Sequence, residues 1–257
     1  MRAAKAASLS EFNSDERRQI ESEWLFLLLL AGWRLGDVIT HEDILDLVWR
    51  QKELNFAPGQ EHLYSNTGYT LLGVIVRRVS GKTLREFTDE RMFKPLRMAH
   101  THFHEQYGSL VKGRAYSYIP LPGAEQAGYR SIALSYSNVG ATSLFTTVDD
   151  LARWDENFYS GGVGGKELLA RMQLQGTLSD GSEIAYASGL MIDDYRGAKV
   201  VEHSGADAGF RVQLLRFPVQ RFSAIVLAST GSISAPQRHW KSSAPTGLQK
   251  SPHSRRP

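Results

Sequence analysis

Apolar residues recur at helical spacing in several parts of the first two thirds of the chain. They predict helices over residues 41–50, 67–80, 83–92 and 147–159. Thr40 and Thr147 stand where the first and last of these helices need an N-cap, and Gly81 stands where the second needs a C-cap. Residues 105–140 are rich in Gly, Tyr, Ser and Pro, which predicts loops with short strands.

The hydrophobic period changes to two between residues 185 and 229. Short strand-like runs follow one another in this stretch, which predicts an antiparallel meander. The turns between the runs are expected at Asp193-Asp194, Arg196-Gly197 and Pro218-Val219. Helices followed by an antiparallel sheet are typical of the α+β class.

The two ends of the chain lack this periodicity. Residues 1–23 are polar and poorly patterned, and residues 231–257 form a basic segment rich in Pro and Ser that is predicted to be disordered. The folded domain is therefore expected over residues 24–230. The apolar run 24–31 is shorter than the roughly 20 residues that cross a bilayer, and mixed acids and bases precede it instead of the basic segment of a signal peptide. We predict neither a membrane span nor a signal peptide, which favours the cytoplasm.

Composition narrows the possible chemistry. None of the 257 residues is cysteine, which excludes disulfides, zinc–thiolate sites and a cysteine nucleophile. The formal net charge is +3, yet residues 229–257 carry five basic side chains and no acidic one, so the basic character belongs to the tail. The tail contains no recognisable nucleic-acid-binding module, and no nucleic-acid partner is expected.

The tripeptide Tyr64-Ser65-Asn66 lies where a loop becomes the predicted helix 67–80. Ser, Asn and Thr are preferred capping residues, so one interpretation is an ordinary helix N-cap. The other is a catalytic element, in which a phenol with a pKa depressed by nearby cations takes the proton of a serine hydroxyl. The two interpretations are compatible, because a capping loop can also present a tyrosine to a cleft.

The tripeptide His203-Ser204-Gly205 ends one of the strand-like runs. Taken alone, it favours a strand end followed by a turn, with a histidine on the surface that titrates near neutral pH. The carboxylate pair Asp149-Asp150 suits the positive N-terminal end of the predicted helix 147–159. Paired acid/base catalysis is disfavoured there, because adjacent helical positions point in different directions.

A histidine-rich tract offers a different chemistry. His100, His102 and His104 alternate, so on a strand they would share a face and, together with Glu105, supply ligands for zinc. We favour a polar loop without a metal, because a short His-rich tract is only a compositional signal.

Taken together, these residues resemble the penicillin-recognising serine hydrolases of the class C β-lactamase, DD-peptidase and esterase type. The matching segments stand in the family's order across residues 33–230 and read FAPGQEHLYSNTGYTLLGVIVRRVSGKTLREF, FKPLRMAHT, VGATSLFTTVDDLARW, YASGLMI and VEHSGADAGF. The resemblance implies a β-lactamase/transpeptidase-like fold, with an antiparallel sheet flanked by helices and a helical subdomain. It also implies hydrolysis of a small-molecule amide or ester through an acyl-enzyme, without a metal or another cofactor.

The resemblance assigns roles to both tripeptides. Tyr64 would be the general base or proton shuttle, and Asn66 would hold the acyl amide and the lysine of the family's Ser-x-x-Lys element. His203, Ser204 and Gly205 would match the family's Lys-Thr-Gly or His-x-Gly strand, line the substrate groove and offer a backbone N–H to an oxyanion hole. A second Tyr-x-Asn tripeptide, Tyr136-Ser137-Asn138, lacks the flanking residues that match the family.

The Ser-x-x-Lys element itself has no counterpart among the matching segments. Ser109 and Lys112 are the one pair with this spacing, and they lie in a loop-like stretch, whereas the motif needs a helix to place both side chains on one face. We therefore expect a serine hydrolase by ancestry that is inactive. The alternatives are an active esterase or peptidase that uses Ser65 or Ser109, and a non-catalytic protein that binds through the old groove or the basic tail.

Both ends of the chain depart from the family's pattern. The hypothesis is a domain that has lost its N-terminal strands, its Ser-x-x-Lys helix and its C-terminal helix, so that the sheet exposes an edge and an uncovered apolar face. Arg97 is a smaller departure, since the family usually has glycine there. If that turn needs a positive φ, arginine costs about 1 kcal/mol or more.

Overall fold

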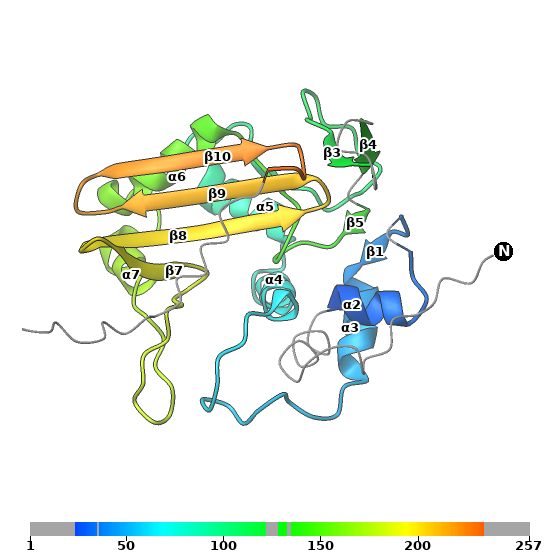
Figure 1. The fold of residues 1–257 in the computed structure, drawn as a ribbon, viewed down its shortest axis with the longest axis horizontal. Helices are drawn as coiled ribbons and strands as arrows, with labels where there is room; N and C mark the ends of the chain where they lie inside the picture. Colours follow the sequence, from blue (N-terminus) through cyan, green and yellow to red (C-terminus); the bar gives the residue numbers. More distant parts are fainter. Residues whose placement is uncertain (1–23, 35, 122–127, 133–134, 234–257) are drawn as a thin grey trace, which may run out of the picture.

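A computed structural model describes residues 24–34, 36–121, 128–132 and 135–233 (Figure 1). The polar segment 1–23 and the predicted disordered tail from residue 234 onward lie outside the described residues. Among the described helices, none is both long and apolar enough to cross a membrane.

Helices dominate the chain as far as residue 171, and the main sheet follows. The helices are α2 (Trp24–Leu30), α3 (His41–Trp49), α4 (Asn66–Ser80), α5 (Leu84–Thr88), the π-helical turn η2 (Asp89–Phe93), α6 (Val148–Ser160) and α7 (Gly165–Arg171). The short strands are β1 (Ile39–Thr40), β2 (His102–Phe103), β3 (Ser117–Pro120), β4 (Tyr129–Ile132), β5 (Tyr136–Ser137) and β6 (Leu144–Phe145). The strands of the main sheet are β7 (Met191–Tyr195), β8 (Ala198–Asp207), β9 (Phe210–Phe217) and β10 (Phe222–Ala228).

The predicted caps set the limits of the helices. The Thr40 side chain accepts a hydrogen bond from the Asp43 backbone N–H and completes a capping box at the start of α3. Thr147 caps α6 through the Asp150 backbone N–H, and Gly81 ends α4 in the left-handed conformation with φ 71°. The helices expected at these places are therefore confirmed. The helix expected over residues 83–92 forms as α5 continued by η2, whereas α7 was not predicted.

The predicted antiparallel meander is confirmed as a sheet with the strand order β10-β9-β8-β7. The expected turn at Asp193-Asp194 is wrong, because both residues lie within β7, where they pair with Val200 and Lys199 of β8. The actual turn is Arg196-Gly197, where φ is 55° and 85°. Two successive positive φ values match the twist of the flanking strands, and the Asp194 carboxylate accepts a hydrogen bond from the Gly197 backbone N–H.

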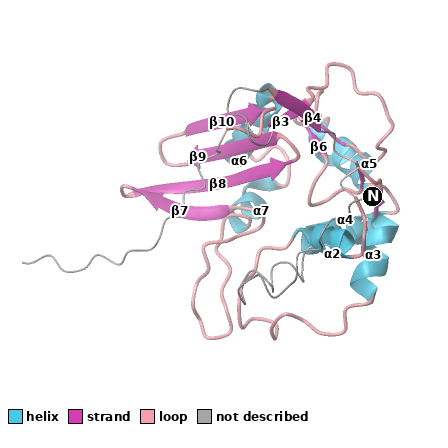
Figure 2. Cartoon of the chain, turned by 45° about the vertical axis from the view of Figure 1, so that its right-hand side comes forward, coloured by secondary structure: helices cyan, strands magenta, loops and turns pink. Residues whose placement is uncertain are grey.

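Helices cover one face of this sheet. In Figures 1 and 2, α6 and α7 lie behind the strands, and Phe158 of α6 packs against buried Leu190, Ile192 and Val201. The opposite face carries exposed apolar side chains, among them Phe222, which is 56% exposed. No described helix crosses in front of that face in Figure 1. The expectation of an uncovered apolar face stays a prediction, because residues 234–257 lie outside the described residues.

A smaller apolar core ties the N-terminal helices to the middle of the chain. Buried Leu28, Ile39, Ile44 and Tyr136 form this cluster. It is held by the parallel pairing of β1 with β5, in which Ile39 faces Tyr136. Neither the pairing nor the cluster was predicted, because strands of two residues have no readable period.

The turn at Arg97 has the positive φ that the family's glycine suggested, with φ 57°. Replacing Arg97 with glycine is expected to raise the free energy of unfolding by about 0.5–1 kcal/mol, because relief of the left-handed strain exceeds the extra entropy of glycine in the unfolded chain. The measurement is a urea unfolding curve. Arg78→Gly, in the last turn of α4, is the matched control, and its free energy of unfolding should fall by up to about 1 kcal/mol. A loss of stability in Arg97→Gly would contradict the strain argument.

Candidate functional site

The N-terminal end of α4 carries the first predicted site residues. The Ser65 hydroxyl caps the helix by accepting a hydrogen bond from the Gly68 backbone N–H at 3.1 Å. Tyr64 directly precedes this cap, and its hydroxyl donates to the Asn66 side-chain oxygen at 3.2 Å. The cap interpretation of the tripeptide is thus confirmed for Ser65, and the tyrosine beside it is 38% exposed. The catalytic interpretation stays a prediction.

The fold brings Tyr64 next to His203 of β8, although the two residues are far apart in the sequence. Their ring centroids are 5.9 Å apart. The ring of Tyr186 lies 6.2 Å from that of Tyr64 and 6.0 Å from that of His203, and the ring of His62 lies 5.2 Å from that of Tyr186. We call these four rings the aromatic cluster. It gathers the loop before α4, the segment before β7 and the middle of β8 at one place.

The other two members of the strand tripeptide differ in orientation. Side chains alternate along a strand, so Gly205 lies on the same face of β8 as His203, whereas the Ser204 side chain points to the opposite face. The described β7 pairs with β8 only as far as Glu202. From His203 onward, β8 has no described strand partner on that side.

Sequence reasoning missed Tyr186, although it stands in the quoted segment YASGLMI. Its hydroxyl oxygen lies 3.1 Å from His203 Nε2. Burial raises the pKa of Tyr186 above the usual range, and the nearby hydroxyls of Tyr69 and Tyr64 add to this effect. The phenol is therefore protonated at neutral pH. The only sequence signal for this residue was its position at the start of YASGLMI, where it precedes small and apolar residues.

The second Tyr-x-Asn tripeptide has a structural role. Tyr136 is buried, and its hydroxyl donates to the Asp207 carboxylate at 3.3 Å. Thr142 donates to the other oxygen of Asp207 at 2.8 Å. Burial raises the pKa of Asp207, and these two hydrogen bonds oppose that shift. The amide of buried Asn138 donates to the Ile39 carbonyl at 3.4 Å, so the tripeptide joins β5 to β1 and β8.

The Ser-x-x-Lys spacing at Ser109 and Lys112 occurs in a loop, as its flanking glycines predict. Both residues are exposed, and neither lies on a helix. The Ser109 hydroxyl donates to the Gln106 side chain at 3.1 Å, not to a base. This pair therefore lacks the common helical face that the chemistry needs.

The carboxylate pair is structural as well. Asp150 is fully buried and accepts hydrogen bonds from the His100 backbone N–H at 2.7 Å and the Thr101 hydroxyl at 2.8 Å. It also pairs with Arg153 at 2.8 Å. Asp150 thus anchors the start of α6 to the chain after η2, and Asp149 lies in the same first turn of that helix.

The histidine tract packs around an aromatic ring. His104 stacks on Phe145 with centroids 4.6 Å apart, and His102 lies 5.5 Å from the same ring. Arg114 covers Phe145 at 5.0 Å. Within the described residues, no group of three or more His, Asp or Glu side chains is arranged to hold a metal ion. The zinc alternative therefore has no support in this part of the chain.

Stability is expected to fall in mild acid because of this packing. Burial lowers the pKa of His102 and His104, and nearby arginine charge lowers both further. A folded-state pKa below the unfolded value of 6.5 means that the fold favours the neutral rings. Their contribution to the free energy of unfolding is therefore fully present above about pH 6.5 and is lost as the pH falls below it. Urea midpoints at pH 7.5 and 5.0 measure the decline. His104→Phe should reduce this decline of the urea midpoint, whereas the exposed control His100→Gln should leave it unchanged. A decline in His104→Phe as large as in the unmodified protein would refute the role of the buried histidines.

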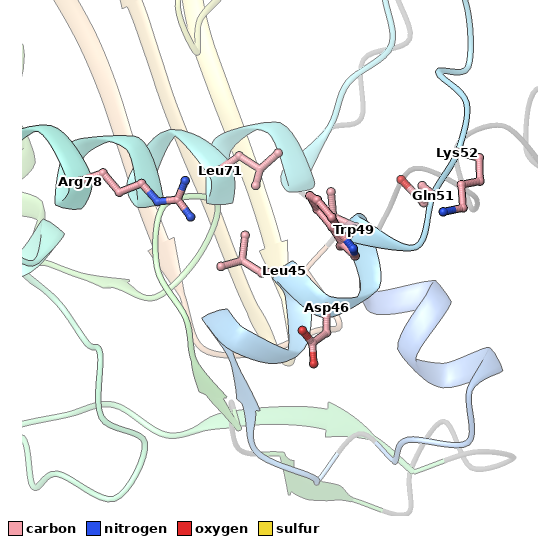
Figure 3. A pocket seen from close by; sticks show the side chains of 8 residues that line it. Leu45, Asp46, Trp49, Gln51, Lys52, Leu71 and Arg78 are labelled. Atoms are coloured by element: carbon pink, nitrogen blue, oxygen red, sulfur yellow. The ribbon is translucent and has the colours of Figure 1, made fainter.

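A pocket of about 700 Å³ lies elsewhere, between α3 and α4 (Figure 3). Trp49 and Leu45 of α3 face Leu71 and Arg78 of α4 across it. None of the aromatic cluster lines this pocket, so it is separate from the candidate site.

Comparison with known proteins identifies the family. A sequence profile of the Beta-lactamase family matches residues 29–243, and the chain belongs to this family. A penicillin-binding protein of Bacillus subtilis is 25% identical over 219 residues, and a D-aminopeptidase of Cereibacter sphaeroides is 23% identical over 213 residues. These matches cover 80% and 83% of this chain but 47% and 40% of the relatives, so the chain spans less than half their length.

Solved structures confirm the β-lactamase/transpeptidase-like fold. A penicillin-binding protein from Bacillus halodurans superimposes with a TM-score of 0.68 at 19% identity, covering 87% of this chain and 72% of that chain. A D-amino acid amidase from Ochrobactrum anthropi SV3, in complex with L-phenylalanine amide, superimposes with a TM-score of 0.63 at 20% identity, covering 82% of this chain and 63% of that chain. The chain is thus related to serine β-lactamase-type hydrolases.

Proposed function

We propose that this chain carries one half of a site for the hydrolysis of small amides or esters and that the chain as it stands does not form the acyl-enzyme. In this proposal Tyr64 is the base, Asn66 orients the acyl group, and the β8 backbone from His203 to Gly205 lines the substrate groove. The proposed chemistry uses no metal or organic cofactor.

The observation that carries the proposal is the meeting of Tyr64 and His203. The two motifs come from distant parts of the chain, yet their rings lie 5.9 Å apart, where β8 has no described strand partner beyond Glu202. A phenol, a side-chain amide and the backbone of a strand without a partner on one side are the kinds of group that bind and activate an acyl substrate. The relatives named above include a D-aminopeptidase and a D-amino acid amidase, which supports an amide substrate.

The proposed lack of acylation rests on where the candidate serines lie. A serine hydroxyl becomes a nucleophile only when a base lies within hydrogen-bond reach. The Ser65 hydroxyl is engaged in the cap of α4, and Ser109 lies on an exposed loop with its hydroxyl on Gln106. Loss of the nucleophile in a site whose members act together removes nearly all of the catalysis.

Two measurements test the two halves of the proposal. The folded protein is treated with a fluorophosphonate probe and with a fluorescent penicillin, and the digest is analysed by mass spectrometry. We expect no stoichiometric labelling of any serine. Stoichiometric labelling of any serine would overturn the inactive state, and labelling of Ser65 or Ser109 would establish that residue as the substitute nucleophile.

The groove is tested by binding. Titration with D-phenylalanine amide, followed by NMR, is expected to perturb the resonances of Tyr64 and His203 and to spare Trp49 in the separate pocket. Tyr64→Ala should abolish these shifts, whereas the control Trp49→Ala should keep them. Shifts confined to Trp49 and its neighbours would show that the groove is assigned to the wrong place. Binding to heparin that requires residues 231–257 would instead favour a role for the basic tail.

A further inference from the structure

The two ring nitrogens of His203 have different partners. Nδ1 lies 2.7 Å from the Ser204 carbonyl oxygen. A carbonyl oxygen only accepts hydrogen bonds, so Nδ1 must carry the proton. In a neutral imidazole the other nitrogen, Nε2, is then an acceptor and needs a donor.

Tyr186 supplies that donor. Its hydroxyl oxygen lies 3.1 Å from Nε2. The phenol stays protonated because burial disfavours the phenolate, so the O–H is present to donate, with the Tyr69 hydroxyl as a second neighbour. A directed chain results, in which the Tyr186 O–H donates to Nε2 and the Nδ1–H donates to the Ser204 carbonyl.

The fold fixes the position of Tyr186 independently of the histidine. Its carbonyl accepts a hydrogen bond from the Gly176 backbone N–H at 2.8 Å, and it forms an isolated bridge with Met191 at the start of β7. The turn that follows is closed by the Ala187 N–H to the Leu190 carbonyl at 2.8 Å and has Gly189 at φ 73°. A Cβ on Gly189 would lie 3.1 Å from the Tyr69 hydroxyl, so the turn also packs against the α4 side of the site.

We propose that Tyr186 is a positioning residue that holds the imidazole of His203 in the Nδ1–H tautomer. This inference deepens the function proposed above and rests on it for its consequence in catalysis. With both nitrogens engaged, the ring of His203 is held in a fixed orientation beside Tyr64. In this tautomer neither ring nitrogen is left to bond a substrate, so the ring contributes packing to the groove and no hydrogen bond.

The tautomer is directly measurable. In protein labelled with ¹⁵N histidine, long-range ¹H–¹⁵N spectra at pH 8 distinguish a protonated from an unprotonated ring nitrogen, and His203→Gln identifies the signal. We expect a protonated Nδ1 and an unprotonated Nε2. A protonated Nε2 in the unmodified protein would overturn the proposal without any variant having to fold.

A variant tests whether Tyr186 is the cause. Tyr186→Phe removes only the donor, so the Nε2 resonance of His203 should shift away from its hydrogen-bonded value while far-ultraviolet circular dichroism stays unchanged. Tyr129→Phe is the matched control, since its hydroxyl lies near Ser232 and away from the cluster. Unchanged His203 nitrogen shifts in a folded Tyr186→Phe protein would refute the positioning role. Neither outcome depends on serine labelling, so this inference and the proposed inactivity can fail separately.

Discussion

Replacing Asp155 with alanine is expected to lower the free energy of unfolding by about 3–5 kcal/mol, because it leaves a buried arginine without its counter-charge. Asp155 of α6 pairs with Arg216 of β9, whose side chain is 1% exposed. Asp155 also accepts a hydrogen bond from the Ser223 hydroxyl at 2.9 Å, so the substitution removes the partner of a second, half-buried group. Urea unfolding at neutral pH measures the loss.

Three further variants separate charge from packing. Asp155→Asn keeps the shape and should still lose much of the stability, since the arginine remains buried and unpaired. The double variant Asp155→Ala with Arg216→Met should regain part of the loss, because a well-packed apolar pair often replaces a buried ion pair at little cost. The neighbouring exposed pair of Glu156 and Arg221 is the control, and Glu156→Ala should cost at most about 1 kcal/mol. Equal losses at Asp155 and Glu156 would refute the buried-charge argument.

Replacing Gly140 with alanine is expected to lower the free energy of unfolding by about 3–5 kcal/mol, from backbone strain and overpacking together. Gly140 has φ 117°, and a Cβ there would lie 2.5 Å from the Tyr69 carbonyl oxygen and 3.1 Å from Thr70 Cα. Both neighbours belong to the backbone of α4, which cannot yield as a flexible side chain would. The added methyl group should therefore push the first turns of α4 away from the strand loops.

Gly81→Ala is the matched control for this substitution. Gly81 also has a positive φ of 71°, but a Cβ there meets nothing within 4 Å. It should lose only the conformational cost of about 1–2 kcal/mol. The difference between the two losses of unfolding free energy then measures the steric clash at Gly140. Losses of the same size in both variants would show that the structure relaxes without a cost from the clash. Because Tyr64 directly precedes the N-cap of α4, its NMR signals should shift in Gly140→Ala and not in Gly81→Ala.

Local chemistry explains which parts of the fold were predictable. Thr40, Thr147 and Gly81 mark helix ends through their own side chain or φ, so the sequence near them sufficed. The main sheet was predictable because its alternation is regular and its turns are short. The misplaced turn at Asp193-Asp194 shows the limit, since turn-forming residues also occur within a strand when a better turn, Arg196-Gly197, follows at once. The β1–β5 pairing could not be predicted from the local sequence, because it joins two segments that are far apart in the chain.

The candidate site was predictable to a similar degree. Tyr64, Asn66 and His203 stand in motifs that resemble a family, so the residues were named before their meeting was known. The orientation of Ser204 away from His203 follows from strand alternation and was overlooked when the tripeptide was treated as a unit. Tyr186 was missed because it lies outside the strands while its partner His203 lies on β8, and a single tyrosine carries no spacing signal.

The pairing of β1 with β5 also sets the order in which the molecule can assemble. Ile39 and Tyr136 are far apart in the sequence, so this contact requires a large loop to close, whereas β7 to β10 are joined by short turns. Contacts between distant segments form late when loop closure limits the rate. In pulse-labelled hydrogen exchange during refolding, amides of residues 198–228 should gain protection before the amide of Ile39. Earlier protection of Ile39 would mean that the N-terminal cluster, not the meander, nucleates the fold.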